Sequence, residues 1–109
     1  MNVRRLKSTD AVRFIGAASR RRPVVRFCKF CMGLTERNKL VGVAIVARPR
    51  ISADRDPGTA EILHLYISNE CPRGGWTKLF RACWDLWRAM GGERLMTYDI
   101  RVSQPVRDP

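Results

Sequence analysis

The chain has 109 residues, enough for one domain with a modest core and too few for a second domain. Its formal net charge of +11 is high for this length and predicts an anionic partner: a nucleic acid, a polyphosphate-bearing cofactor, or an acidic protein or membrane surface. No apolar run is long enough to cross a bilayer or to form a signal-peptide core, so we expect a cytoplasmic protein whose four cysteines are free thiols.

The first half of the chain predicts a strand, a helix and a hairpin. Residues 2–6 have the length of an edge strand, and residues 9–19 have the apolar spacing of a helix. Residues 24–48 are rich in strand-forming side chains on both sides of a polar turn, which predicts a hairpin. Residues 50–58, with alternating Arg and Asp and one Pro, are typical of an exposed loop.

Three consecutive arginines, Arg20, Arg21 and Arg22, lie between the predicted helix and Pro23, which ends it. The plain interpretation is a solvated helix end. The alternative is a clamp for a phosphate, a nucleic acid or an acidic protein. The sequence leaves both open.

The second half, residues 59–100, predicts strand, glycine turn, amphipathic helix and strand, followed by a tail at 101–109. The turn between the first strand and the helix holds Pro72, Gly74 and Gly75, and Arg73 and Lys78 lie beside it. A helix start presents unpaired N–H groups and the positive end of the helix dipole, so this turn suits a phosphate or pyrophosphate. The alternative is an ordinary connection in which the glycines only turn the chain.

Four side chains invite a chemical role. Cys28 and Cys31 have the spacing of a zinc pair, but on a regular strand residues three apart face opposite ways, and no second pair follows, so no metal site is expected. His64 is the only histidine, and Glu61 lies three residues before it on the same predicted strand. These two face opposite sides of the sheet unless the strand bulges between them.

The order of elements resembles the GNAT superfamily of acyl-CoA N-acyltransferases. The segment Leu40 to Pro49 (LVGVAIVARP), the helix through Met90-Gly91 and the strand Arg94 to Tyr98 are most similar to a small phage- or prophage-borne GNAT-like family of unassigned function. The resemblance implies an α+β fold in three layers, with a mixed, mainly antiparallel sheet of about five strands and two helices in the order β-α-β-β-β-α-β. It also implies that the C-terminal strands of the usual fold are missing or truncated.

The function that this resemblance implies is acetyl transfer from acetyl-CoA to an amine of an unknown acceptor, with no membrane partner and with a homodimer as one option. Coenzyme A would be held by two segments of the second half, which contain Tyr66, Ile67 and Ser68, and Arg73, Gly74, Gly75, Trp76 and Thr77. Glu61, His64 and Tyr98 are the candidates for proton transfer.

The turn departs from the family's pattern at two positions. Cys71 stands in place of Gln or Arg, and Trp76 stands in place of a small residue, which predicts a narrowed phosphate site. A hypothesis of another class therefore remains open: a non-catalytic basic module, or phage effector, that binds nucleic acid or an acidic protein through its arginines.

Overall fold

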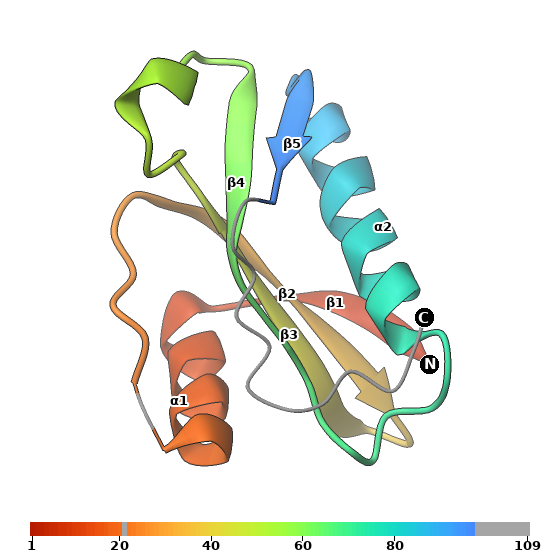
Figure 1. Cartoon of the computed structure of the whole chain (residues 1–109). Helices are drawn as coiled ribbons and strands as arrows, with labels where there is room; N and C mark the ends of the chain where they lie inside the picture. Colours follow the sequence, from red (N-terminus) through yellow and green to blue (C-terminus); the bar gives the residue numbers. More distant parts are fainter. Residues whose placement is uncertain (21, 98–109) are drawn as a thin grey trace.

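The computed structural model describes residues 1–20 and 22–97. It contains a five-stranded sheet in the order β1-β2-β3-β4-β5 (Figure 1). The strands are β1 (Asn2–Leu6), β2 (Cys28–Glu36), β3 (Lys39–Ala47), β4 (Thr59–Ile67) and β5 (Arg94–Met96), with the helices α1 (Ser8–Ser19) and α2 (Gly75–Ala89) and a short 3-10 turn at Ser52–Asp54. The first four strands pair antiparallel, and β5 pairs parallel to β4. The predicted mixed sheet and element order are confirmed.

The two helices cover opposite faces of the sheet, which gives three layers (Figure 1). On one face α2 buries Leu79, Cys83 and Trp87 against β2, β3 and β4. On the other face α1 buries Ala11 and Ile15. Because β3 is covered on both faces, Val41 through Ala47 are all buried, as the near-continuous apolar run of this strand requires.

The predicted hairpin is longer than the observed one. Residues 24–27 lie outside β2, and Phe27 has a positive φ of 55°, which an extended strand does not allow. The carbonyl of Phe27 still accepts a hydrogen bond from the Arg48 amide (3.1 Å). The segment therefore approaches the end of β3 as a loop.

Bulges change which side chains share a face, and two of the three register shifts in the described sheet involve candidate residues. In β2, Cys28 pairs with Ala47 and Phe30 with Val46, so Lys29 is an extra residue. In β4, Ile62 pairs with Val46 and His64 with Ile45, so Leu63 is an extra residue. Each extra residue shifts the alternation of the strand by one position.

Candidate functional site at the diverging end of β4 and α2

The edge of β4 is paired over only part of its length. Thr59, Ala60 and Glu61 pair with β5, whereas in the described part of the chain no strand pairs with the later residues of β4 on that side. The amide of Ser68 donates to the carbonyl of Val41 (2.8 Å), so Ser68 faces β3, and by strand alternation Tyr66 does too. The backbone groups of Leu65 and Ile67 therefore point to the open edge.

The closed end of this edge is fixed by Trp87 of α2. Its indole Nε1 donates to the carbonyls of Arg94 (2.9 Å) and Gly58 (3.2 Å). The same Gly58 carbonyl accepts the amides of Glu93 (2.8 Å) and Arg94 (2.9 Å). These bonds hold α2, β4 and β5 together at one end, while the opposite end of β4 leads into the turn before α2.

The backbone geometry and the packing of that turn each require a glycine, at Gly74 and at Gly75. Gly74 is the N-cap of α2 with a φ of 90°, a conformation that other residues rarely adopt. Gly75 is buried, and a Cβ there would overlap the Sγ of Cys71. Cys71 is itself buried and packs under the turn. The replacement of Gln or Arg by Cys71 therefore fills space inside the turn and does not present a side chain to a ligand.

The start of α2 leaves backbone donors free. The Lys78 amide donates to Gly74 O (3.0 Å) and the Gly75 amide to Pro72 O (3.3 Å), but the amides of Trp76 and Thr77 have no partner among the described residues. No described side chain caps this helix, and no acidic residue lies in its first turn. The described residues therefore leave the positive end of the helix dipole uncompensated, which favours an anion.

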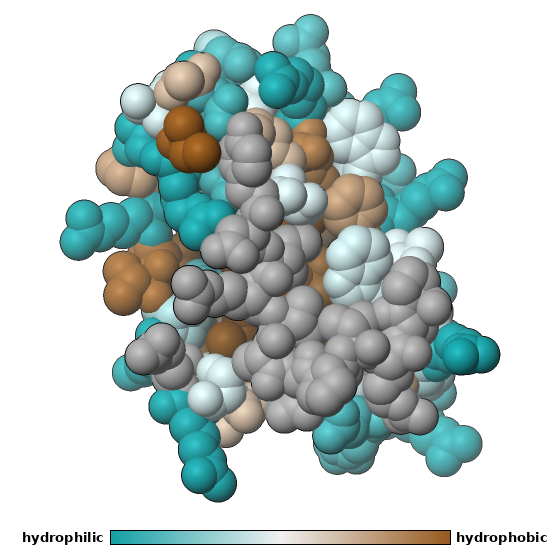
Figure 2. Space-filling model, in the orientation of Figure 1, coloured by the Kyte–Doolittle hydropathy of each residue, from teal (hydrophilic) through white to brown (hydrophobic). Residues whose placement is uncertain are grey.

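Trp76 lies along α2 and packs on the core. Its ring stacks on Phe80, one turn later, with centroids 5.6 Å apart and planes at 5°. Both rings are partly buried against the cluster that α2 forms with the sheet. In Figure 2 pale and brown side chains gather over α2, which shows this apolar stripe. The bulk of Trp76 is directed to this stripe, so it does not cap the helix end.

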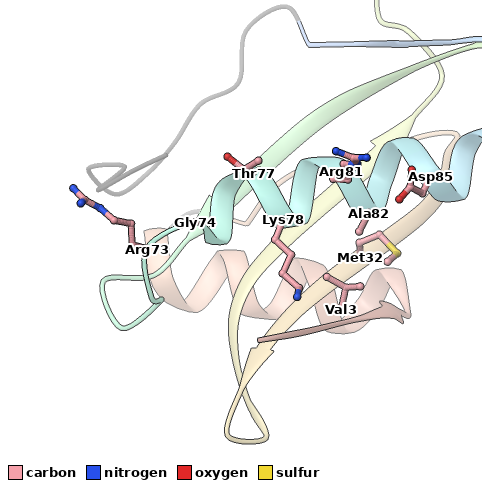
Figure 3. Close-up of a pocket in the computed structure, with 9 residues that line it drawn as sticks. All are labelled: Val3, Met32, Arg73, Gly74, Thr77, Lys78, Arg81, Ala82 and Asp85. Atoms are coloured by element: carbon pink, nitrogen blue, oxygen red, sulfur yellow. The ribbon is translucent and has the colours of Figure 1, made fainter.

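A groove of about 850 Å³ runs along another side of α2, between this helix and β1 (Figure 3). Val3 and Met32 lie at its base, and Lys78 points toward Val3. Arg73, at the end of the groove, points away from it. The side chains of Arg73 and Lys78 thus point in different directions, and only that of Arg73 is directed outward at the start of α2.

The bulge at Leu63 brings Glu61 and His64 to the same face of the sheet. His64 pairs with Ile45, which lies on the face that α1 covers, and Glu61 pairs with Ala47, which shares that face with Ile45 by strand alternation. Glu61 is fully buried and accepts three hydrogen bonds from Arg50, from its amide (2.8 Å), Nε (3.1 Å) and Nη2 (2.8 Å). A carboxylate with these partners is held in place and anchors the loop that carries Arg50.

His64 is only partly buried, and its imidazole makes no hydrogen bond to a described residue. Its surroundings lower its pKa below the ordinary value, mainly because burial disfavours the imidazolium and also because Arg50 carries a positive charge. The imidazole is therefore neutral at physiological pH, the form that accepts a proton.

The prediction that Cys28 and Cys31 face opposite ways was wrong. The extra residue Lys29 places both on one face, with their sulfurs 3.6 Å apart. A hydrogen bond from Cys31 lowers the pKa of Cys28 to about 7, against the opposing effect of burial. In residues 1–20 and 22–97, no three His, Cys, Asp or Glu side chains gather as a metal site would require.

Of the remaining residues predicted to have a function, some are described by the structure and others lie outside the described residues. The Tyr66 ring is buried and meets Phe14 edge-on at 5.6 Å, so its side chain belongs to the core. Tyr98 and Arg21 lie outside the described residues. Arg20 and Arg22 are exposed. No described helix is long and apolar enough to span a membrane.

Comparison with known proteins identifies the fold. No family model matches the chain, and no curated protein sequence matches it. Solved structures do match. A GNAT family acetyltransferase from Staphylococcus aureus superposes with a TM-score of 0.65 at 12% identity, over 92% of this chain and 87% of that one.

Two aminoglycoside acetyltransferases are similar to the same extent. One, meta-AAC0020 from an uncultured soil metagenomic sample, was solved with sisomicin and matches with a TM-score of 0.64 at 17% identity, over 92% of this chain and 78% of that one. The other, AAC(6')-Iy, was solved with CoA and matches with a TM-score of 0.62 at 10% identity, over 97% and 81%. The chain therefore has the fold of GNAT acetyltransferases.

Proposed function

We propose that this chain, with its GNAT fold, is an N-acyltransferase that transfers an acetyl group from acetyl-CoA to an amine. The observation that carries the proposal is the edge of β4 that no described strand covers, which leads directly into an α2 start whose Trp76 and Thr77 amides have no described partner. An extended amide-bearing arm can pair with such an edge as an added strand, and a pyrophosphate suits the helix start.

The residues present fit coenzyme A in two places. The backbone of Ile67 and the neighbouring Leu65 would pair with the pantetheine amides, which narrows the predicted set because Tyr66 and Ser68 face β3. The amides of Trp76 and Thr77, with the charge of Arg73, would hold the pyrophosphate. Gly74 and Gly75 shape the turn that presents these groups. When bound, acetyl-CoA supplies the activated thioester carbonyl.

The proposed proton acceptor is His64, directly or through a water molecule. It is neutral, partly accessible, and positioned on β4 next to the bulge. Glu61 is given a positioning role, because its carboxylate is committed to Arg50. Tyr98 keeps its predicted role as phenol donor. Most of the rate enhancement would come from holding amine and thioester together.

Calorimetry with two ligands tests the site. Acetyl-CoA should bind, and S-acetylpantetheine, which lacks the pyrophosphate, should bind at least tenfold more weakly, the effect of losing about one charge-assisted hydrogen bond. Arg73→Gln should weaken the binding of acetyl-CoA and leave the binding of S-acetylpantetheine unchanged. Arg13→Gln on α1 removes the same charge far from the turn and serves as control. No binding of acetyl-CoA at millimolar concentration would refute the proposal.

A non-catalytic role remains the second candidate, favoured by the net charge of +11 and the exposed Arg4, Arg5, Arg20 and Arg22. In this role the basic surface binds nucleic acid or an acidic protein, as a phage effector would. Affinity for a DNA duplex that falls steeply as salt rises would support nucleic-acid binding. Affinity that is the same in low and high salt would count against it.

A further inference from the structure

A second cavity, of about 360 Å³, lies where the loop before β2 meets the loop between β3 and β4. Four arginines line it: Arg26, Arg48, Arg50 and Arg55. Among the described residues no carboxylate lines it, and Asp54 and Asp56 of the same loop are not part of its wall. The sequence pattern of alternating Arg and Asp predicted only an exposed loop here, so this cluster is a finding of the structure.

Only one of the four positive charges is neutralised by a described carboxylate. Arg50 pairs with Glu61. Arg55 donates to the carbonyls of Pro49 (2.8 Å) and Arg50 (2.9 Å), which orient its guanidinium and leave its charge uncompensated. The cavity therefore carries an excess of positive charge, and the side chains of Arg48, Arg50 and Arg55 are already held in place by contacts.

Arg48 gives the sharpest indication that the cavity suits an anionic ligand. Its guanidinium lies over the Phe27 ring, 3.7 Å from the centroid, and its Nε is buried without a hydrogen-bond partner in the described residues. A buried donor without a partner costs free energy unless a ligand or water satisfies it. Phe27 itself is 62% exposed and has a positive φ, although it is a large apolar residue. The Phe27 ring under the guanidinium is a cation–π contact that holds the Arg48 side chain in place at the cavity.

The cavity adjoins the proposed site of acyl transfer. Its wall includes Leu63, the extra residue of the β4 bulge, which directly precedes His64. A ligand held by the arginines would therefore lie beside the strand that carries the proposed proton acceptor. The volume is near the lower end of the range for small-molecule pockets, about 300–1,000 Å³, so the ligand is a small molecule.

We propose that this cavity binds a phosphate group on the amine acceptor, so that the acceptor is a small phosphorylated amine. The identification as an acceptor rests on the proposed function. A phosphate carries up to two charges and presents several oxygens to the paired N–H groups of arginine, which matches the uncompensated cations here better than a single carboxylate does.

The test measures binding to the full chain by calorimetry at constant ionic strength, with and without acetyl-CoA. O-phosphoethanolamine, ethanolamine and inorganic phosphate are the three probes. O-phosphoethanolamine should bind at least tenfold more tightly than ethanolamine and more tightly than phosphate alone. Arg26→Gln and Arg48→Gln should each weaken it by about tenfold or more. The Arg26 side chain is exposed and makes no hydrogen bond or ion pair with a described residue, so its variant should fold, which circular dichroism checks.

Two controls separate this cavity from the other anion site and from general charge. Arg13→Gln should leave the affinity unchanged. Arg73→Gln at the α2 turn is titrated without acetyl-CoA, where it reports only whether the phosphate binds at the turn. Loss of affinity in Arg73→Gln but not in Arg26→Gln and Arg48→Gln would overturn the proposal, since the phosphate would then sit at the turn. Equal binding of inorganic phosphate and O-phosphoethanolamine would overturn the acceptor role, and no binding of either would overturn the site. Failure of acetyl-CoA to bind overturns the proposed function separately, because these titrations are also run without it.

Discussion

The carboxylate of Glu61 and the main chain and side chain of Arg50 form three hydrogen bonds, between a fully buried acid and a residue at the surface. The pair joins β4 to the loop between β3 and β4. Because Arg50 also lines the arginine cavity, the same bonds fix one wall of that cavity. Glu61 thus helps to position one wall of the cavity by holding Arg50 in place.

Removing the partner of this acid should destabilise the fold. Arg50→Met leaves the Glu61 carboxylate buried without its cation and should lower the free energy of unfolding by about 3 kcal/mol. Arg13→Met, in the exposed pair with Asp10, is the matched control and should change it by less than about 0.5 kcal/mol. Urea denaturation measures both. Equal effects of the two substitutions would show that the burial of Glu61 carries no energetic weight.

The second prediction concerns the packing beneath the glycine turn before α2. Gly75→Ala would place a Cβ against the Cys71 sulfur and close to Leu34, so we expect it to lower stability by about 1–3 kcal/mol. Cys71→Ala in the same chain removes the nearer clash and should recover part of that loss. Thermal unfolding of the single and double variants measures this coupling. If the stability changes of Gly75→Ala and Cys71→Ala simply add in the double variant, the predicted contact between a Cβ at position 75 and the Cys71 sulfur is wrong.

The order of strands and helices could be predicted from the sequence because local patterns determine it. The apolar run of β3 and the stripe of α2, with Leu79, Cys83 and Trp87 at four-residue steps, each indicate one element. The glycine turn was predictable in the same way, since Gly74 and Gly75 end one element and begin the next.

The faces of individual side chains could not be predicted, because one extra residue decides them. Lys29 and Leu63 are ordinary strand residues, and nothing in their composition marks a bulge. The bulges nevertheless determine that Cys28 faces Cys31 and that Glu61 shares a face with His64. The pairing of Arg50 with Glu61 depends on contact between two segments, which local patterns do not contain.

The third prediction follows from the contact of Cys28 with Cys31. Since the pKa of Cys28 is lowered to about 7, its alkylation by iodoacetamide should rise with a midpoint near pH 7. Cys31→Ala removes the hydrogen bond and should move the midpoint toward the ordinary value of 9.0. Cys71 and Cys83 are buried and should react slowly in the folded chain, which mass spectrometry of the labelled peptides verifies. An unchanged midpoint in Cys31→Ala would remove Cys31 as the cause.

The last prediction uses the lowered pKa of His64. A histidine whose pKa is lower in the folded than in the unfolded chain binds more protons when unfolded, so it destabilises the fold as pH falls below the ordinary value of 6.5. Between pH 7 and pH 5 the wild-type chain should therefore lose more stability than His64→Gln does. Urea denaturation at both pH values measures the difference.

The acetylation rate of the same variant tests the proposed role of His64 in proton transfer. As proton acceptor, His64 should contribute about 10²-fold or more to the acetylation rate at pH 7, whereas binding of acetyl-CoA by calorimetry should be unaffected by its loss. His64→Gln keeps a polar side chain of similar size, so a rate loss with unchanged cofactor affinity separates proton transfer from packing. A variant that acetylates at the wild-type rate would leave proton removal to solvent or to Tyr98, and His64 would then be a residue of the β4 bulge alone.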